Sequence, residues 1–133
     1  MELSQQRVLV TGATSGIGET IAQAFAQAGA QVKGTGATAA EVDRASAANA
    51  HLSIHFHPLD VGDASAVHSF VTGLGELDVV VNCAGVIQRQ VELEPEAFAK
   101  TIDINLNGTC AFVLPRVKAS SSGAVASSTP RQC

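Results

Sequence analysis

The sequence has no tyrosine and no tryptophan among its 133 residues, and aromatic residues make up only 4% of it. Without tyrosine, this chain offers no phenol as an acid or a base. Charged residues are also few, at 15%, whereas hydrophobic residues reach 46%, a balance that argues against intrinsic disorder. No apolar run approaches the roughly 20 residues needed to cross a bilayer. The N-terminus lacks a basic segment followed by an apolar one, so we expect neither a membrane partner nor a secretory signal.

Basic residues and cysteines are scarce too. The net charge is −4 and no basic face is evident, so we expect no nucleic-acid partner. Cys83, Cys110 and Cys133 are odd in number and widely spaced, which predicts a reducing compartment, no disulfide framework and no zinc site. His55 and His57 would share one face of a strand, but no third metal ligand is evident, so we favour ordinary strand residues and expect no metal. The cytoplasm is the simplest location.

Strand-like and helix-like segments alternate along most of the chain. Aliphatic and β-branched runs predict strands at residues 7–11, 31–35, 52–59 and 77–81, with Pro58 at the end of the third because proline cannot donate to a ladder. Helices are predicted at residues 17–28, 39–50, 63–72 and from Pro95 to about residue 106, with Asp63 as an N-cap. The apolar sides of three helices are predicted at Ile17, Ile21, Ala24, Phe25 and Ala28, at Val67, Phe70 and Val71, and at Phe98, Ile102 and Leu106. Strands alternating with helices predict βαβ units and a parallel sheet in an α/β fold.

The composition changes after about residue 109. Pro115 stands where a helix should still be running, and a serine-rich stretch and Pro130 follow. Only residues 123–127 suit a strand. Two interpretations stay open, a frayed tail or a departure from the preceding pattern through truncation or a change of reading frame.

The first predicted strand runs into the sequence TGATSGIG at residues 11–18, and a helix follows at once. A helix N-terminus offers free backbone N–H groups and the positive end of a dipole, which suit a diphosphate. Gly12 permits the tight turn out of the strand, while Gly16 and Gly18 let phosphates and the sheet approach the helix closely. Thr14 and Ser15 add hydroxyl donors. The alternative is a glycine turn with a structural role only.

This loop resembles the T-G-x-x-x-G-x-G cofactor loop of the short-chain dehydrogenase/reductase family. Three further matches follow in that family's order. Asp60-Val61 resembles the Asp-Val pair after the third strand, and residues 82–85 (NCAG) resemble N-N-A-G, with Cys83 in place of the second Asn. Asn105, in the segment INLNG, resembles the family's catalytic-site Asn.

The resemblance covers about residues 5–109 and implies a Rossmann-like, doubly wound parallel sheet that is incomplete at the C-terminus. It implies a dinucleotide-binding portion at 1–109, a divergent tail at 110–133, and hydride transfer between NAD or NADP and an alcohol or carbonyl. The implied cofactor-binding residues are Gly12, Thr14, Ser15, Gly16, Ile17, Gly18, Thr35, Asp60, Val61, Asn82, Ala84 and Gly85, and the implied catalytic residue is Asn105. Each match keeps a plainer alternative: Asp60 as a turn cap, residues 82–85 as a small-residue strand exit, and Asn105 as a solvated helix position.

The end of the second predicted strand bears on the choice of cofactor. NAD-preferring Rossmann proteins place an acid there to bind the ribose 2′-OH, whereas here Gly36 stands in that position and residues 33–38 contain no acid. Thr35 and Thr38 could donate to a 2′-phosphate, but Ser15 stands where many NADP-using relatives carry arginine. We therefore predict a small preference for NADP(H) over NAD(H). Lys33 is interpreted as a solvent-facing strand residue.

The family's acid/base pair, Tyr-x-x-x-Lys, cannot occur in a chain without tyrosine. Lys118 precedes the place where the pair would fall, and Ser127 and Ser128 resemble the family's fifth-strand serine only weakly. Three hypotheses stay open for this chain: the cofactor-binding portion of an oxidoreductase, a non-catalytic dinucleotide-binding or interaction module, and a truncated or frameshifted product. An uncovered fourth strand with an open edge would favour homo-oligomers or aggregation.

Overall fold

The computed structural model describes residues 3–85, 94–109 and 124–127. The strands are β1 (Arg7–Thr11), β2 (Gln31–Gly36), β3 (Ile54–Pro58), β4 (Val79–Asn82) and β5 (Ala124–Ser127). The helices are α1 (Gly16–Gln27), α2 (Ala39–Ala48), α3 (Ala64–Gly73) and α4 (Pro95–Ile102), and α4 continues into a π-helical turn, η1 (Asp103–Asn107).

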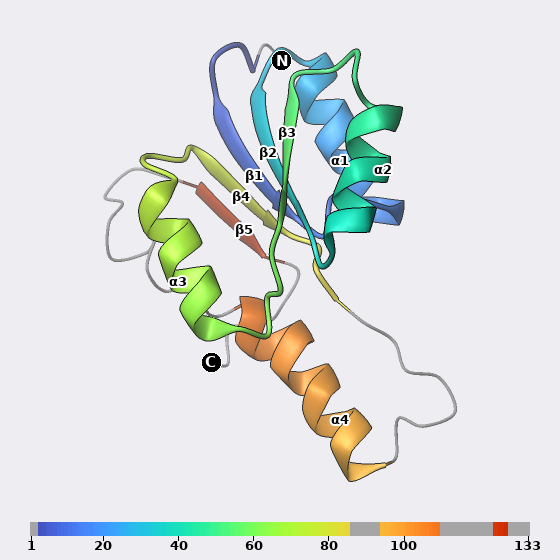
Figure 1. The fold of residues 1–133 in the computed structure, drawn as a ribbon. Coiled ribbons are helices and arrows are strands. Elements are labelled where there is room, and N and C mark those ends of the chain that lie inside the picture. The colour runs from blue at the N-terminus through green and yellow to red at the C-terminus, as the bar shows by residue number, and fades with distance from the viewer. Residues whose placement is uncertain (1–2, 86–93, 110–123, 128–133) are drawn as a thin grey trace.

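All five strands are parallel and lie in the order β3-β2-β1-β4-β5 (Figure 1). The chain first builds outward from β1 to β3 and then returns to the other side of β1, so the order reverses between β1 and β4. Such a reversal leaves a crevice at the carboxyl ends of the two central strands, which is where open α/β sheets bind ligands. The predicted Rossmann-like fold class is confirmed.

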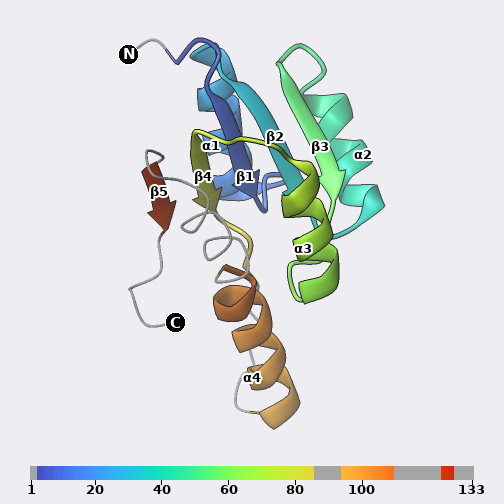
Figure 2. The ribbon, with the colours of Figure 1, turned by 90° about the vertical axis from the view of Figure 1, so that its left-hand side faces the viewer.

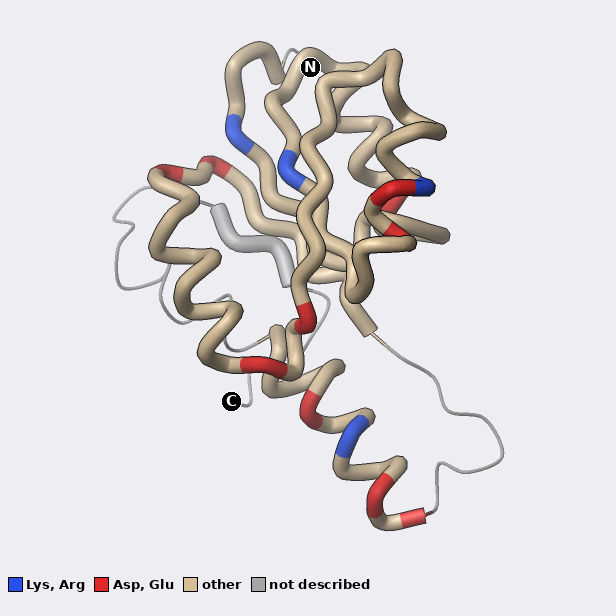
Figure 3. The backbone as a smooth tube through the Cα atoms, in the orientation of Figure 1, with Lys and Arg blue, Asp and Glu red and all other residues tan. Residues whose placement is uncertain are grey.

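Helices cover both faces of the sheet, α1 and α2 on one side and α3 on the other (Figures 1 and 2). Val8 and Val10 of β1 pack into the core under α1, while Leu9 packs with Val67 and Val71 of α3. The two central strands, β1 and β4, are nearly continuous apolar runs, as expected for strands buried on both faces. In β2 and β3 polar residues alternate with apolar or small ones. Arg7 and Lys33 are the only Lys, Arg, Asp or Glu residues in the five strands, and Figure 3 shows the remaining charged positions on helices and connections.

The apolar side predicted for α1 is partly wrong. Ile17 is 78% exposed and Ala24 is exposed, whereas Ala22 is fully buried. The small residues Gly18 and Ala22 form the buried side because they let the helix approach the sheet closely. Gln23 is held instead by a hydrogen bond from its Nε2 to Asn49 Oδ1 of 2.7 Å.

The last predicted helix also differs from the structure. Regular α-helix stops at Ile102, and the π-helical turn that follows inserts an extra residue per turn and so shifts the side predicted for Leu106. Helix α4 runs away from the sheet beyond the carboxyl ends of the strands (Figures 1 and 2). Phe98 is consequently 59% exposed and Ile102 is 36% exposed, instead of being packed on the described core.

The strand predicted near residues 123–127 is present as β5. It pairs along β4 from Val79–Ala124 to Asn82–Ser127, so β4 is not the open edge that we expected. The outer strands of the described sheet are β3 and β5. The predicted Asp63 cap is confirmed, since its Oδ1 accepts hydrogen bonds from Ser65 N and Ala66 N.

Candidate functional site

The glycine loop bends β1 directly into α1. Gly12 and Gly16 have φ of +64° and +58°, a conformation that side chains disfavour. A Cβ on Gly12 would lie 2.7 Å from Ala84 Cα, and a Cβ on Gly18 would collide with the carbonyl oxygen of Gly12. These contacts bring the loop, the first turn of α1 and the end of β4 together with no room for side chains.

The N-terminus of α1 has no side-chain cap. Ser15 is its N-cap residue in an extended conformation, and the Ser15 side chain makes no capping hydrogen bond. By contrast, α2 is capped by Thr38 and α3 by Asp63. A Cβ on Gly16 would meet nothing within 4 Å, so the outer side of this turn is open. The first amides of α1 can therefore donate hydrogen bonds to an external anion, as helix N-termini commonly do.

The side chain of Thr11 fastens the end of β4 to the loop. Thr11 is 1% exposed, and its Oγ1 accepts hydrogen bonds from Cys83 N and Ala84 N, both of 3.1 Å. Sequence reasoning used Thr11 only as the first letter of the loop motif. The signal that was available is a hydroxyl-bearing β-branched residue at the last position of a buried strand.

A cleft of about 370 Å³ opens at the carboxyl edge of the sheet beside this loop. Its volume is in the range of small-molecule sites. The predicted site residues that line it are Gly12, Thr14, Ser15, Ile17, Gly18, Thr35, Asp60, Val61, Ala84 and Gly85. The lining also includes Gly36, Ala37, Glu41, Leu59, Cys83 and Ile104, none of which is among the predicted site residues.

Three predicted site residues do not line the cleft. Gly16 lies in the first turn of α1 next to it, and Asn82 is only 6% exposed at the end of β4. Asn105 is half-buried in η1, with its Oδ1 3.1 Å from where a Cβ on Gly85 would lie. Asn105 is thus a neighbour of the cleft, brought there by the π-helical turn.

Contacts of Gly108 explain how η1 is positioned. A Cβ on Gly108 would lie 2.9 Å from Val61 O, so the end of η1 packs directly on the connection that follows β3. Thr109 Oγ1 donates to Asn105 O at 3.1 Å, which ties the same turn together. π-Helical turns are costly and are often found at functional sites.

Asp60 and Thr35 both line the cleft, but their side chains differ in what they can offer a ligand. Asp60 Oδ1 accepts from Gly62 N at 2.9 Å, so the turn-cap alternative is real and coexists with exposure to the cleft. Thr35 is 0% exposed, and its hydroxyl has no hydrogen-bond partner among the described residues. The predicted donation from this hydroxyl to a cofactor is therefore not available in this conformation. The carbonyl of Thr35 accepts from Ala13 N at 2.8 Å and so holds the glycine loop against β2.

Cys83 lines the cleft but is not an activated nucleophile. Burial raises the pKa of its thiol above the ordinary value, so the neutral thiol predominates near neutral pH. The half-buried side chain fits here as a small apolar residue.

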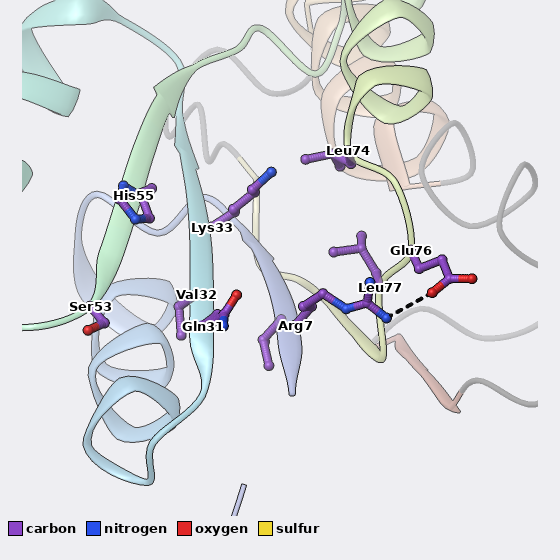
Figure 4. A pocket seen from close by; sticks show the side chains of 10 residues that line it. Arg7, Gln31, Val32, Lys33, Ser53, His55, Leu74, Glu76 and Leu77 are labelled. Carbon is purple, nitrogen blue, oxygen red and sulfur yellow. Dashed lines mark hydrogen bonds and ion pairs between the residues drawn. The ribbon is translucent and has the colours of Figure 1, made fainter. Parts of the chain in front are cut away.

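A second cavity, of about 290 Å³, lies at the amino ends of the strands (Figure 4). Lys33 and His55 line it, together with Arg7, whose guanidinium is 3.2 Å from Glu76. Lys33 thus lines the cavity at the amino ends of the strands and does not line the cleft at their carboxyl ends, so it cannot assist a ligand in the cleft. None of the helices in the described ranges begins at this cavity, and so the cleft at the carboxyl edge is the candidate site.

Histidines on β3 belong to the same face as Lys33. Burial first, and then the charges of Lys33 and His55, lower the pKa of His57, whose ring packs edge-on against Phe70 with centroids 5.6 Å apart. Within the described ranges, no three His, Cys, Asp or Glu side chains come together in a group that could hold a metal ion.

Comparison with known proteins agrees with this arrangement. A family model described as short chain dehydrogenase matches residues 6–129. The chain is 35% identical over 118 residues to 2-keto-3-deoxy-L-fuconate dehydrogenase of Xanthomonas campestris, covering 85% of this chain and 39% of that protein. It is 36% identical over 106 residues to human L-xylulose reductase, covering 78% and 43% of the two chains.

Solved structures show the same likeness. A short-chain type dehydrogenase/reductase from Mycobacterium ulcerans superposes with a TM-score of 0.85 at 25% identity, over 96% of this chain and 52% of that one. A protein described as a short chain dehydrogenase/reductase family protein gives a TM-score of 0.84 at 32% identity, over 96% and 56%. This chain spans from 39% to 58% of the length of the first two curated relatives. None of the helices in the described part is long and apolar enough to cross a membrane.

Proposed function

Since this chain belongs to the short-chain dehydrogenase family, we propose that residues 1–109 form the dinucleotide-binding portion of an NAD(P)-dependent oxidoreductase, with residues 110–133 as a divergent tail. The observation that carries the proposal is the uncapped N-terminus of α1, which opens on a cleft between β1 and β4. The family match continues to residue 129, so the tail includes family sequence at β5.

The residues of the cleft fit a nicotinamide dinucleotide. Amides of the first turn of α1, reached past Gly12 and Gly16, would hold the diphosphate. Asp60 and Val61 would border the adenine, and Ala84 and Gly85 would border the nicotinamide side. When bound, the nicotinamide supplies or accepts the hydride that interconverts an alcohol and a carbonyl.

Acid/base chemistry is the part that this chain does not supply in the family's usual form. Asn105 is our proposed catalytic-site residue, next to Gly85, but no tyrosine is available to exchange a proton with the substrate oxygen. Ser127 is a weaker candidate for the substrate-orienting serine, because its backbone pairs with Asn82 at the carboxyl edge. Lys118 and Ser128 lie outside the described residues. We therefore propose that the isolated chain binds the dinucleotide without turnover, which makes a non-catalytic module the second candidate function.

Titration of the purified chain with NADH and NADPH, followed by cofactor fluorescence and thermal shift, tests the proposal. We expect saturable binding, with loss of at least about tenfold in affinity for Gly18→Ala, because a Cβ there collides with Gly12 O. Gly73→Ala is the matched control, since a Cβ on Gly73 meets nothing within 4 Å. A folded chain that binds neither cofactor, or a Gly18→Ala variant that binds normally, would contradict the proposal.

A carbonyl and alcohol panel then tests the absence of turnover. The names of the relatives include a xylulose reductase and a threitol dehydrogenase, so we propose polyhydroxy compounds as the substrate class and include L-xylulose and D-threitol. Turnover by the pure chain would refute the view that it is catalytically incomplete. Binding without turnover would favour a non-catalytic dinucleotide-binding module over a truncated or frameshifted product. Cytoplasmic location and homo-oligomers stay predictions.

The small preference for NADP(H) that Gly36 predicts stays a prediction. Among the similar solved structures, an actinorhodin polyketide ketoreductase at 25% identity is described as a complex with NADPH. The charges that line the cleft do bear on this choice.

A further inference from the structure

The described lining of the cleft is acidic. Glu41 and Asp60 are its only charged residues, and no Lys, Arg or His side chain lines it among the described residues. A 2′-phosphate adds nearly two negative charges to the dinucleotide. In such a lining it would meet repulsion with no compensating cation.

The ordinary position for a discriminating acid is closed in this chain. Gly36 occupies the end of β2, where an acid would bind the ribose 2′-OH. The Thr14 side chain fills the space beside it: a Cβ on Gly36 would collide with Thr14 Cγ2 and lie 2.9 Å from Thr14 Oγ1. Any side chain at position 36, an acid included, would therefore require Thr14 to shift.

Glu41 brings a carboxylate to the same region from α2. It lines the cleft together with Gly36 and Ala37, although it lies five residues beyond the strand end. The sequence pattern does not predict this, because Glu41 lies outside residues 33–38, where the acid that binds the ribose 2′-OH is expected. Its Oε2 accepts from Thr38 N at 3.1 Å, and Thr38 Oγ1 accepts from Glu41 N at 3.2 Å.

This reciprocal capping box has a consequence for anions. A 2′-phosphate near Gly36 would otherwise find the N-terminal amides of α2, which attract negative charge. Here the Thr38 N–H is already bonded to the Glu41 carboxylate, and the capping box holds that carboxylate at the helix start. The protein's own negative charge thus lies at the start of α2, where it would repel a phosphate.

We propose that Glu41 replaces the missing strand-end acid and makes this site select NAD(H), the dinucleotide without a 2′-phosphate, over NADP(H). The inference rests on the proposed function and reverses the small preference that Gly36 alone predicts. Glu41 is a specificity-determining residue in this view, because its carboxylate lines the same cleft as Gly36, where it would repel a phosphate and could accept from a hydroxyl.

Arg44 is the cation that could oppose this effect. It lies one turn beyond Glu41 on α2, and its Nη2 donates to Thr14 O at 3.4 Å. It does not line the cleft, so its described contact is with the back of the glycine loop. We therefore assign Arg44 a part in holding the loop for both cofactors alike.

Dissociation constants for NADH and NADPH, measured by calorimetry or cofactor fluorescence, test the proposal without requiring turnover. We expect the wild-type chain to bind NADH at least about fivefold more tightly. Glu41→Gln keeps the capping-box geometry and removes the charge, so NADPH should bind about fivefold more tightly while NADH changes by less than about threefold. Asp43→Asn is the matched control, because it removes the same charge from an exposed position of α2 that does not line the cleft.

The outcomes separate the two proposals. Equal affinities in the wild type, or the same NADPH-to-NADH ratio in Glu41→Gln and the wild type, would overturn the role of Glu41 and leave the dinucleotide site standing. A selective loss of NADPH binding in Arg44→Gln would assign the 2′-phosphate to Arg44 and also overturn it. Absence of binding of either cofactor to the folded chain would overturn the site itself.

Discussion

Two buried threonines on neighbouring strands allow a sharp test of what holds the cleft together. Thr11 and Thr35 are 1% and 0% exposed, at the carboxyl ends of β1 and β2. The Thr11 hydroxyl accepts from Cys83 N and Ala84 N, whereas the Thr35 hydroxyl has no partner among the described residues. Replacement by valine keeps the shape of each side chain and removes only the hydroxyl.

The structure assigns the two replacements different costs. In Thr11→Val, Cys83 N still donates to the Thr11 carbonyl at 3.2 Å, but Ala84 N loses the hydroxyl that it donates to. Leaving one partly buried donor unsatisfied costs about 1–3 kcal/mol of unfolding free energy. In Thr35→Val no hydrogen bond is lost and an unsatisfied buried hydroxyl is removed, so we expect a change between zero and about 1 kcal/mol of stabilisation.

Urea denaturation followed by far-UV circular dichroism measures both variants, because a chain without tryptophan or tyrosine has little intrinsic fluorescence. We expect Thr11→Val to unfold at lower urea than Thr35→Val, with a difference of about 1–3 kcal/mol. Thr11→Ser restores the acceptor and should recover part of the stability that Thr11→Val loses. Equal stability of the two valine variants would refute the view that the Thr11 hydroxyl joins β4 to the glycine loop.

Three further predictions concern the helices and the histidines. Asp63→Ala should lower stability by about 1 kcal/mol in the same urea assay, because two amides of α3 lose their acceptor, while Asp63→Asn should lose much less. The pKa of His57 is lowered in the folded state, so the unfolded chain takes up the proton first and stability falls as pH drops below about 6.5. Melting temperatures at pH 7.5 and 5 should therefore differ less in His57→Gln than in the exposed control His68→Gln, and an unchanged difference would contradict this. Phe98→Ser should reduce the self-association that we predict, measured by light scattering after size-exclusion chromatography, and Lys100→Ser on the same exposed helix should not.

Local signals were enough to predict the architecture. The run at residues 8–11 is apolar or β-branched on both faces, which is typical of a buried strand, and the run at 31–36 has apolar or small residues on one face at least. Asp63 is an N-cap because its carboxylate needs only the next two or three amides. The glycine loop was predictable for the same reason, since its conformation is determined within eight consecutive residues.

Contacts between distant segments were not predictable in this way. The Thr14 side chain fills the space that a side chain on Gly36 would need, although 22 positions of sequence separate the two residues. The residues next to either of them do not indicate this contact. Ile17 is exposed because α1 packs on the sheet through its small residues Gly18 and Ala22. The spacing of hydrophobic residues along the helix does not indicate that the small residues form the buried side. Glu41 lies at the cleft because α2 begins just after Thr38, whose side chain caps the helix and holds Glu41 in its first turn.

The contact between Gly12 and Ala84 sets an order of events during synthesis. Gly12 leaves the ribosome more than seventy residues before Ala84. For most of translation, therefore, the residues that pack against the glycine loop have not yet been made. Nothing can be held there until β4 has docked beside β1, and any nucleotide that binds will then favour only chains that have completed this step. Binding of a nucleotide in the cleft would therefore stabilise the state in which β4 is docked on β1.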